Sequence, residues 1–245
     1  MLHDKAALIT GGGTGIGRAI ALRLAAAGAA VSLNYSRSRD EAQETADEIA
    51  AAGGTARICQ ADVADDAQVR AMVEEAAQVH GRLDILVNSA GVTNFVPQDD
   101  LEGLKEEYWD RALGVNVKGM FFSCRAAAPH LKARGGCIVN VTSVAGLTAQ
   151  GSSIAYAASK AAAISLTKSL ARVLAPEVRV NSIAPGIVMT RWVAGHEDHV
   201  ERLAAGPPQG RAATPEDVAE VAFANITQAG FVTGQNLVID GGMFI

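Results

Sequence analysis

The stretch "LITGGGTGIGRAIALRL", Leu8 to Leu24, places a short apolar run directly before a cluster of glycines and then a helical pattern. Glycines at Gly11, Gly15 and Gly17 let the backbone turn sharply and approach a pyrophosphate, which the positive end of the following helix attracts. The spacing is TGxxxGxG rather than the usual GxGxxG. Because the glycines lie between a strand pattern and a helix pattern, the stretch predicts a dinucleotide site.

The alternation of apolar run and helical stretch continues along the chain. Short runs rich in Val, Ile and Leu are separated by longer stretches rich in Ala, Glu and Lys; the runs are "AALIT", "AVSLNY", "ARICQ", "LDILVNSAG", "CIVNVTS", "VRVNSIAPG" and "NLVID". This rhythm is typical of a parallel sheet covered on both faces by helices. The sequence therefore predicts an α/β fold, a single Rossmann-type doubly wound domain over residues 1–245 with a seven-stranded parallel sheet.

Helix boundaries are marked at three places. Ser38 with Glu41 has the spacing of a capping box, and "TPED" from Thr214 combines a cap, a proline for the first turn and two acids. Pro176 is expected to end the helix before it.

Composition excludes several classes of protein. A net charge of -5 with mixed signs offers no basic stripe for nucleic acid and no polybasic anchor for a membrane. The apolar runs are too short to cross a bilayer, and "MLHDKAALIT" lacks the apolar stretch of a signal peptide, so we expect a soluble cytoplasmic protein. Cys59, Cys124 and Cys137 have no metal or disulfide spacing, and we expect three reduced core residues.

Four motifs, in order, resemble the short-chain dehydrogenase/reductase family over essentially the whole chain. They are "TGGGTGIG", "NSAG" from Asn88, "YAASK" from Tyr156, and "PG" at Pro185. "NSAG" replaces the commoner NNAG, and Ser89 is expected to support the strand equally well. The resemblance implies a catalytic tetrad of Asn116, Ser143, Tyr156 and Lys160. It also implies cofactor contacts from Gly11, Thr14, Gly15, Ile16, Gly17, Ser36, Arg37, Asp62, Val63, Asn88, Ala90, Gly91, Tyr156, Lys160, Pro185, Gly186, Val188 and Thr190.

The chemistry of the tetrad can be stated from residue types. Residues four apart share one face of a helix, so Lys160 is expected beside Tyr156, where its charge would lower the pKa of the phenol. Ser143 would hold the substrate oxygen, and the resemblance implies that Lys160 grips the nicotinamide ribose and that Asn116 holds a water. Taken singly, these residues could be a packed ring, a solvated charge, a strand end and a helix kink. Their joint order favours catalysis.

The choice of cofactor is read from the end of the second apolar run. An NAD site usually has an acid there, but "NYSR" ends in Ser36 and Arg37, which are placed to bind a 2'-phosphate. We therefore expect NADP(H) to be favoured over NAD(H). Thr14 stands where many NADP-dependent relatives have an arginine, and Arg37 could instead be a solvent-facing charge.

The substrate is the least determined feature. Residues 187–213, including Trp192, are expected to form a lid. The resemblance is nearest to 3-oxoacyl-carrier-protein reductases, so the expected reaction interconverts a ketone and a secondary alcohol, with a small-molecule or acyl-carrier-linked substrate. Sugar, steroid or other secondary-alcohol dehydrogenases remain alternatives, as does a non-catalytic dinucleotide sensor.

Three expectations concern partners. The family's pairing of helices, with apolar residues such as Met120, Phe121, Ile164 and Leu170 on more than one helix face, favours a homotetramer. No metal is expected, because His196 and His199 lack a third ligand. Arg125 and Arg172 could meet an acidic carrier protein, but an interface or solvent position is expected.

Overall fold

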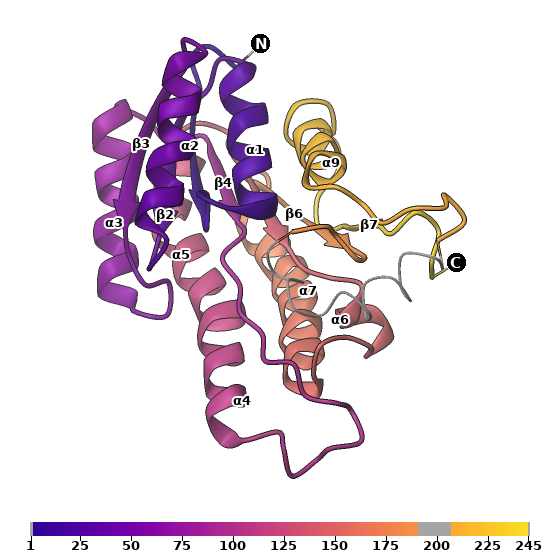
Figure 1. Ribbon diagram of the computed structural model, residues 1–245. Coiled ribbons are helices and arrows are strands. Elements are labelled where there is room, and N and C mark those ends of the chain that lie inside the picture. Colours follow the sequence, from indigo (N-terminus) through magenta and orange to yellow (C-terminus); the bar gives the residue numbers. More distant parts are fainter. Residues whose placement is uncertain (1, 191–206, 245) are drawn as a thin grey trace.

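In the computed structural model, which describes residues 2–190 and 207–244, a sheet of seven parallel strands runs through the molecule (Figure 1). The spatial order of the strands is β3-β2-β1-β4-β5-β6-β7. The chain therefore reverses its direction of progress across the sheet after β3, and this crossover beside β1 is where doubly wound folds bind their ligands. The strands are β1 (Ala6–Thr10), β2 (Ala30–Tyr35), β3 (Thr55–Gln60), β4 (Ile85–Asn88), β5 (Cys137–Val141), β6 (Arg179–Pro185) and β7 (Asn236–Ile239).

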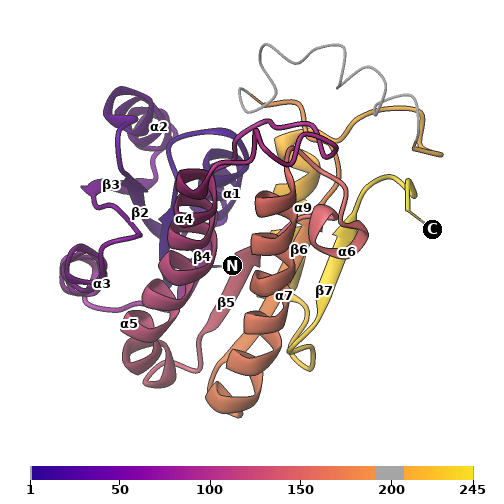
Figure 2. The same cartoon turned by 90° about the horizontal axis from the view of Figure 1, so that it is seen from below.

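Helices cover both faces of the sheet, as predicted (Figure 2). One face is covered by α1 (Gly15–Ala26), α2 (Arg39–Ala51) and α9 (Pro215–Thr227). The other is covered by α3 (Asp66–His80), α5 (Met120–Lys132) and α7 (Ile154–Leu174). The remaining described helices are α4 (Glu106–Leu113), the π-helical turn η1 (Gly114–Gly119) and α6 (Ala145–Thr148).

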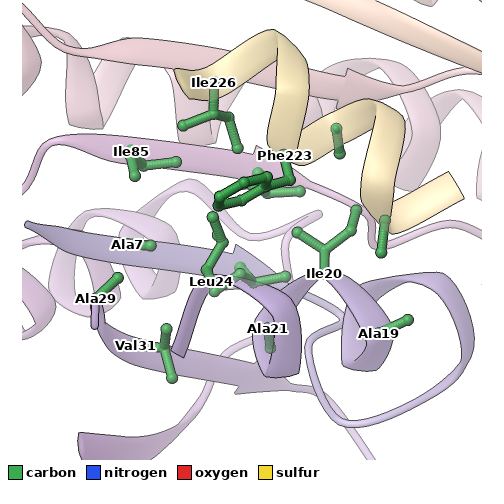
Figure 3. Close-up of a cluster of buried hydrophobic side chains, with 14 of the residues drawn as sticks. Ala7, Ala19, Ile20, Ala21, Leu24, Ala29, Val31, Ile85, Phe223 and Ile226 are labelled. Atoms are coloured by element: carbon green, nitrogen blue, oxygen red, sulfur yellow. The ribbon is translucent and has the colours of Figure 1, made fainter. Parts of the chain in front are cut away.

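The central strands carry apolar side chains toward both layers of helices. All five residues of β1 are buried, which explains why the run is continuous rather than alternating. In the layer of α1 and α9, Phe223 and Ile226 face Ile20 and Leu24 above the sheet (Figure 3). Burial of these side chains fixes α1, and with it the glycine turn that begins α1.

The glycine turn between β1 and α1 requires residues without a side chain. Gly11 and Gly15 have φ values of 64° and 52°, in the left-handed region that favours glycine. A Cβ at Gly17 would lie 2.2 Å from the carbonyl oxygen of Gly11. The turn can therefore fold back closely enough for its amides to face the pocket described below.

The predicted helix boundaries are largely confirmed. Thr214 caps α9 in a full capping box with Asp217, and α7 ends at Leu174, before Pro176. The exception is α2, which begins after Ser38 but in which no helix amide donates a capping hydrogen bond to the serine side chain. Helix α2 instead begins with the backbone bond from Ala42 N to the Ser38 carbonyl.

The structure also bears on the predicted absence of a membrane span and on the predicted lid. Among the described residues, no helix has both the length and the apolar character that a membrane span requires. Most of the predicted lid, including Trp192, lies at residues 191–206, outside the described residues.

Candidate active site

One large pocket of about 1240 Å³ opens along the carboxyl ends of the strands. Its volume exceeds the range of about 300–1,000 Å³ that is usual for a drug-sized ligand, as a dinucleotide with its substrate requires. Of the predicted site residues, the pocket is lined by Gly11, Thr14, Gly15, Ile16, Ser36, Arg37, Asp62, Val63, Ala90, Gly91, Ser143, Tyr156, Lys160, Pro185, Gly186, Val188 and Thr190. Gly17, Asn88 and Asn116 do not line it.

Tyr156 and Ser143 meet at one wall of this pocket. Tyr156 lies in the first turn of α7, where the side chain of Ser153 caps the helix by accepting from the Tyr156 amide. Ser143 follows β5, and its hydroxyl bonds the Tyr156 side chain. The Ser143 Oγ also accepts from Ala145 N at 3.1 Å, which holds the hydroxyl in place. Two hydroxyl groups from different elements are thus joined at a surface that a ligand can reach.

Lys160 lies one turn after Tyr156, and its ammonium group hydrogen-bonds a backbone carbonyl. Its Nζ donates to the Val141 carbonyl at 2.9 Å and lies 5.7 Å from the centroid of the Tyr156 ring. The residue is only 6% exposed, and burial lowers the pKa of its ammonium to about 8. An ammonium that can lose its charge near neutral pH is unusual among protein lysines.

The predicted effect of Lys160 on Tyr156 is wrong for this structure. Burial raises the pKa of the Tyr156 phenol to about 12, and the opposing contribution comes from the hydrogen bond with Ser143. The physical reason is that the phenolate would lose hydration at the pocket wall, while the Lys160 charge is turned to Val141. Tyr156 is therefore protonated at neutral pH.

Asn116 supports the site from behind rather than lining it. Its Oδ1 accepts from Val92 N at 2.9 Å, and its Nδ2 donates to the Val92 carbonyl and to Ser159 Oγ. The side chain thus ties the segment after β4 to α7. Both hydrogens of the Nδ2 group are therefore used, whereas the Oδ1 can still accept one further hydrogen bond.

Asn34 is a site residue that our sequence reasoning passed over. Its Oδ1 accepts from Gly11 N at 3.3 Å, and its Nδ2 donates to the carbonyls of Tyr35, Cys59 and Ala61. One buried amide therefore joins the glycine turn to the ends of β2 and β3. The available signal was an amide side chain next to the end of a largely apolar strand.

The end of β2 carries the expected basic group. Ser36 and Arg37 are exposed and line the large pocket. The described residues include no carboxylate in an ion pair with Arg37. Asp40 and Glu41 belong to the first turn of α2, as predicted. The guanidinium is thus available to an anion at this end of the pocket.

The cysteines add no reactive thiol to the site. All three cysteines are free and buried, as predicted, and burial raises the pKa of Cys59 and of Cys124 to about 12. In residues 2–190 and 207–244, no group of three or more His, Cys, Asp or Glu residues could hold a metal ion. His196 and His199 lie outside the described residues.

Comparison with known proteins agrees with this geometry. Residues 11–244 match a family model described as "Enoyl-(Acyl carrier protein) reductase". The 3-oxoacyl-(acyl-carrier-protein) reductase FabG of Staphylococcus aureus is 39% identical, with 100% of both chains covered.

Solved structures of dehydrogenases also match this chain over nearly its whole length. A short-chain dehydrogenase from Burkholderia cenocepacia J2315, in complex with NADP, has a TM-score of 0.92 and 38% identity, covering 100% of this chain and 99% of that chain. A dehydrogenase/reductase from Sinorhizobium meliloti 1021 also has a TM-score of 0.92, with 39% identity, over 98% of this chain and 95% of that chain.

Proposed function

Because this chain belongs to the short-chain dehydrogenase/reductase family and is thus an NAD(P)-dependent oxidoreductase, we propose that it reduces 3-oxoacyl thioesters with NADPH. The observation that carries the proposal is the hydroxyl pair of Ser143 and Tyr156 at the wall of a pocket that also runs past the glycine turn. A carbonyl placed against this pair would share the pocket with a cofactor held by the glycine turn.

The residues present fit such a cofactor. The glycine turn provides amides at the start of α1 for a pyrophosphate, with Gly11 and Gly15 in conformations that bring the backbone close. At one end of the pocket are Ser36 and Arg37, and at the other are Tyr156 and Lys160. The bound cofactor supplies the hydride.

Side chains of the protein supply the proton that the reduction requires. Tyr156 donates its hydroxyl proton to the carbonyl oxygen, and Ser143 hydrogen-bonds the same oxygen as charge develops on it. The raised pKa of Tyr156 keeps the phenol protonated at neutral pH, which suits a group that must give a proton.

The proposed substrate class is supported by the pocket and by the relatives. Apolar side chains that line the same pocket as the hydroxyl pair include Phe95, Val144, Met243 and Phe244, which suit an acyl chain. The FabG relative is named for acyl-carrier-linked 3-oxoacyl substrates. We propose the same class for this chain, with the acyl group carried by a protein or a small thiol.

The experiment that tests the function is a substrate screen. Acetoacetyl thioesters and keto sugars are each offered with NADPH and NADH, secondary alcohols are offered with NADP⁺ and NAD⁺, and cofactor absorbance is followed. We expect the highest kcat/KM with an acetoacetyl thioester and NADPH. A higher kcat/KM with a sugar or an alcohol assigns the other substrate class, and tight cofactor binding without any turnover indicates a sensor.

A further inference from the structure

The part of the large pocket around Ser143 has two arms of different chemistry. Ser143 follows β5, which lies between β4 and β6 in the sheet. The segment after β4 therefore leads away from Ser143 in one direction, and the segments after β6 and β7 lead away in the other. Because parallel strands end at the same edge of a sheet, all of these segments can line one pocket.

The arm on the β4 side has a mainly polar lining. Two loops are joined there, because Val96 N donates to the Ser152 carbonyl at 2.9 Å. The Gln98 Nε2 also donates to the Ala149 carbonyl at 2.9 Å. Amide and hydroxyl side chains in this arm can hydrogen-bond the amide groups of the thiols that carry acyl chains. The side chains that line this polar arm are Phe95, Gln98, Gln150 and Ser152.

The arm on the β7 side has an apolar lining. Val144 N, after β5, donates to the carbonyl of Pro185 at the end of β6 at 3.0 Å. Gly186 N donates in turn to the carbonyl of Ile239 at the end of β7 at 2.9 Å. Since neighbouring strands are about 4.8 Å apart, the end of β7 lies about 10 Å from the end of β5. The side chains that line this apolar arm are Ile187, Val188, Met243 and Phe244.

Asp240 holds the segment that carries the far end of the apolar arm. Its Oδ1 accepts from Gly242 N at 2.9 Å, and its Oδ2 accepts from Phe244 N at 3.0 Å. Gly242 has a φ of 86°, in the left-handed region that favours glycine, so the backbone can turn tightly enough for both bonds. The carboxylate of Asp240 therefore positions Met243 and Phe244 at the pocket.

We propose that the acyl tail of the substrate lies in the apolar arm and its thioester in the polar arm, and that Phe244, positioned by Asp240, selects for long acyl tails. This inference rests on the proposed function, because it concerns the ketone held by Ser143 and Tyr156. Three bonds of an extended chain span about 3.5 Å, so a tail needs about eight bonds beyond the ketone to cover about 10 Å. A 3-oxododecanoyl group reaches Phe244, whereas a 3-oxobutanoyl group does not.

The test measures kcat/KM for the pantetheine thioesters of 3-oxobutanoate and 3-oxododecanoate at saturating NADPH. In the wild type, the longer thioester is expected to have a kcat/KM about tenfold higher, because its tail loses contact with water. Phe244→Ala should remove most of this preference and leave the shorter thioester within about twofold of the wild-type value. Asp240→Ala should have the same effect, although it keeps both apolar side chains.

Two further variants separate positioning from general damage. Asp65→Ala is the matched control, since Asp65 also accepts from two backbone amides but lies at the start of α3 and does not line the pocket. It should leave the ratio of the two kcat/KM values unchanged. Gln150→Leu tests the orientation of the substrate. It should lower kcat/KM by the same factor for both thioesters, because both contain the pantetheine group.

Three results overturn the proposal. The first is a wild type that does not prefer the longer thioester. The second is an equal loss for both thioesters in Phe244→Ala and in Asp240→Ala. The third is a loss in Gln150→Leu that is confined to the longer thioester, which indicates the opposite orientation. In each case the enzyme still reduces 3-oxoacyl thioesters, so the proposed function stands.

A binding measurement covers the case in which neither thioester is reduced and the proposed function fails. Dodecanoyl pantetheine, which lacks the ketone, is titrated into the NADP⁺-bound protein by calorimetry. Its Kd is expected to be about tenfold higher for Phe244→Ala and Asp240→Ala than for the wild type and Asp65→Ala. Equal Kd values for all four proteins would show that the apolar arm does not hold an acyl tail.

Discussion

Tyr156 and Lys160 are adjacent on one helix face, yet their pKa values respond to different surroundings. Burial raises the pKa of Tyr156 to about 12 and lowers that of Lys160 to about 8. Both shifts favour the uncharged form, as expected when desolvation outweighs a charge–charge contact. The result is a tyrosine that remains a proton donor over a wide pH range and a lysine that loses its charge in mildly alkaline solution.

The first residue-scale prediction concerns Tyr156→Phe. We expect kcat for ketone reduction to fall by about 10²–10⁴-fold, because that is the usual contribution of a positioned proton donor. The affinity for NADPH should stay close to the wild-type value, since the ring and the glycine turn are retained. Steady-state kinetics and fluorescence titration measure the two quantities. A variant that keeps most of its turnover would refute the role proposed for the hydroxyl.

The second prediction follows from the pKa of Lys160. The side chain is charged below about pH 8 and neutral above it, so KM for NADPH should rise roughly tenfold between pH 7 and pH 9. Lys160→Met should have a high KM already at pH 7, with little further change. A wild-type KM that is flat over this range contradicts the assignment of Lys160 to the cofactor.

The third prediction concerns Arg37 at the end of β2. Arg37→Ala should lose most of the preference for NADPH over NADH, because a charge-assisted contact with the 2'-phosphate is removed. Activity with NADH should barely change. Arg39→Ala is the matched control, since Arg39 is also exposed but does not line the pocket. A wild type that prefers NADH would overturn the proposed cofactor choice.

At the scale of elements, the site depends on how helices begin. Ser153 caps α7 next to Tyr156, and Thr214 caps α9, which packs against α1 and supports the glycine turn. Arg211 and the Thr214 amide also hold Asp217, and together they keep the pKa of its carboxyl far below the usual value. The capping residues at the starts of α7 and α9 therefore help to fix the position of Tyr156 and of the glycine turn in the pocket.

The element-scale prediction is Thr214→Ala. Loss of the capping hydrogen bond from Asp217 N should lower the free energy of unfolding by about 1 kcal/mol. Thr214→Ser keeps a hydroxyl at the cap and should remain near the wild type. Urea denaturation of the three proteins measures the difference. Equal losses for alanine and serine would indicate that the threonine methyl, rather than the cap, is responsible.

In the whole molecule, three of the four apolar residues named for a homotetramer do not lie at the surface. Met120, Ile164 and Leu170 are buried within the chain itself and cannot form an interface. Phe121 and Phe122 of α5 are only partly buried, and Leu113 and Val173 are exposed at 38% and 67%. These residues, on α4, α5 and α7, are the apolar surface that a partner subunit could cover.

We still propose a homotetramer on that revised basis. Light scattering at micromolar concentration is expected to give four times the mass of one chain, 25.3 kDa. The partly buried phenylalanines and the two exposed residues supply the physical reason, because an exposed apolar surface is stabilised by association. A monomeric mass would contradict the proposal.

Much of the fold could be predicted from the sequence because its signals are local. All seven strands, the glycine turn and the end of α7 before Pro176 follow from periodicity and from the restricted backbones of glycine and proline. The membership of Ser143, Tyr156 and Lys160 in one pocket was also expected, from the resemblance to the family and from the four-residue spacing of Tyr156 and Lys160 on one helix.

Other features were decided only by the tertiary structure. The direction of the Tyr156 pKa shift, the use of Asn34 beneath the glycine turn and the position of Phe244 in the wall of the pocket could not be read from spacing. Each depends on which strands are neighbours and on how much water remains around a group. The burial of a side chain and its hydrogen-bond partners depend on residues far apart in the chain. A local sequence pattern therefore cannot predict them.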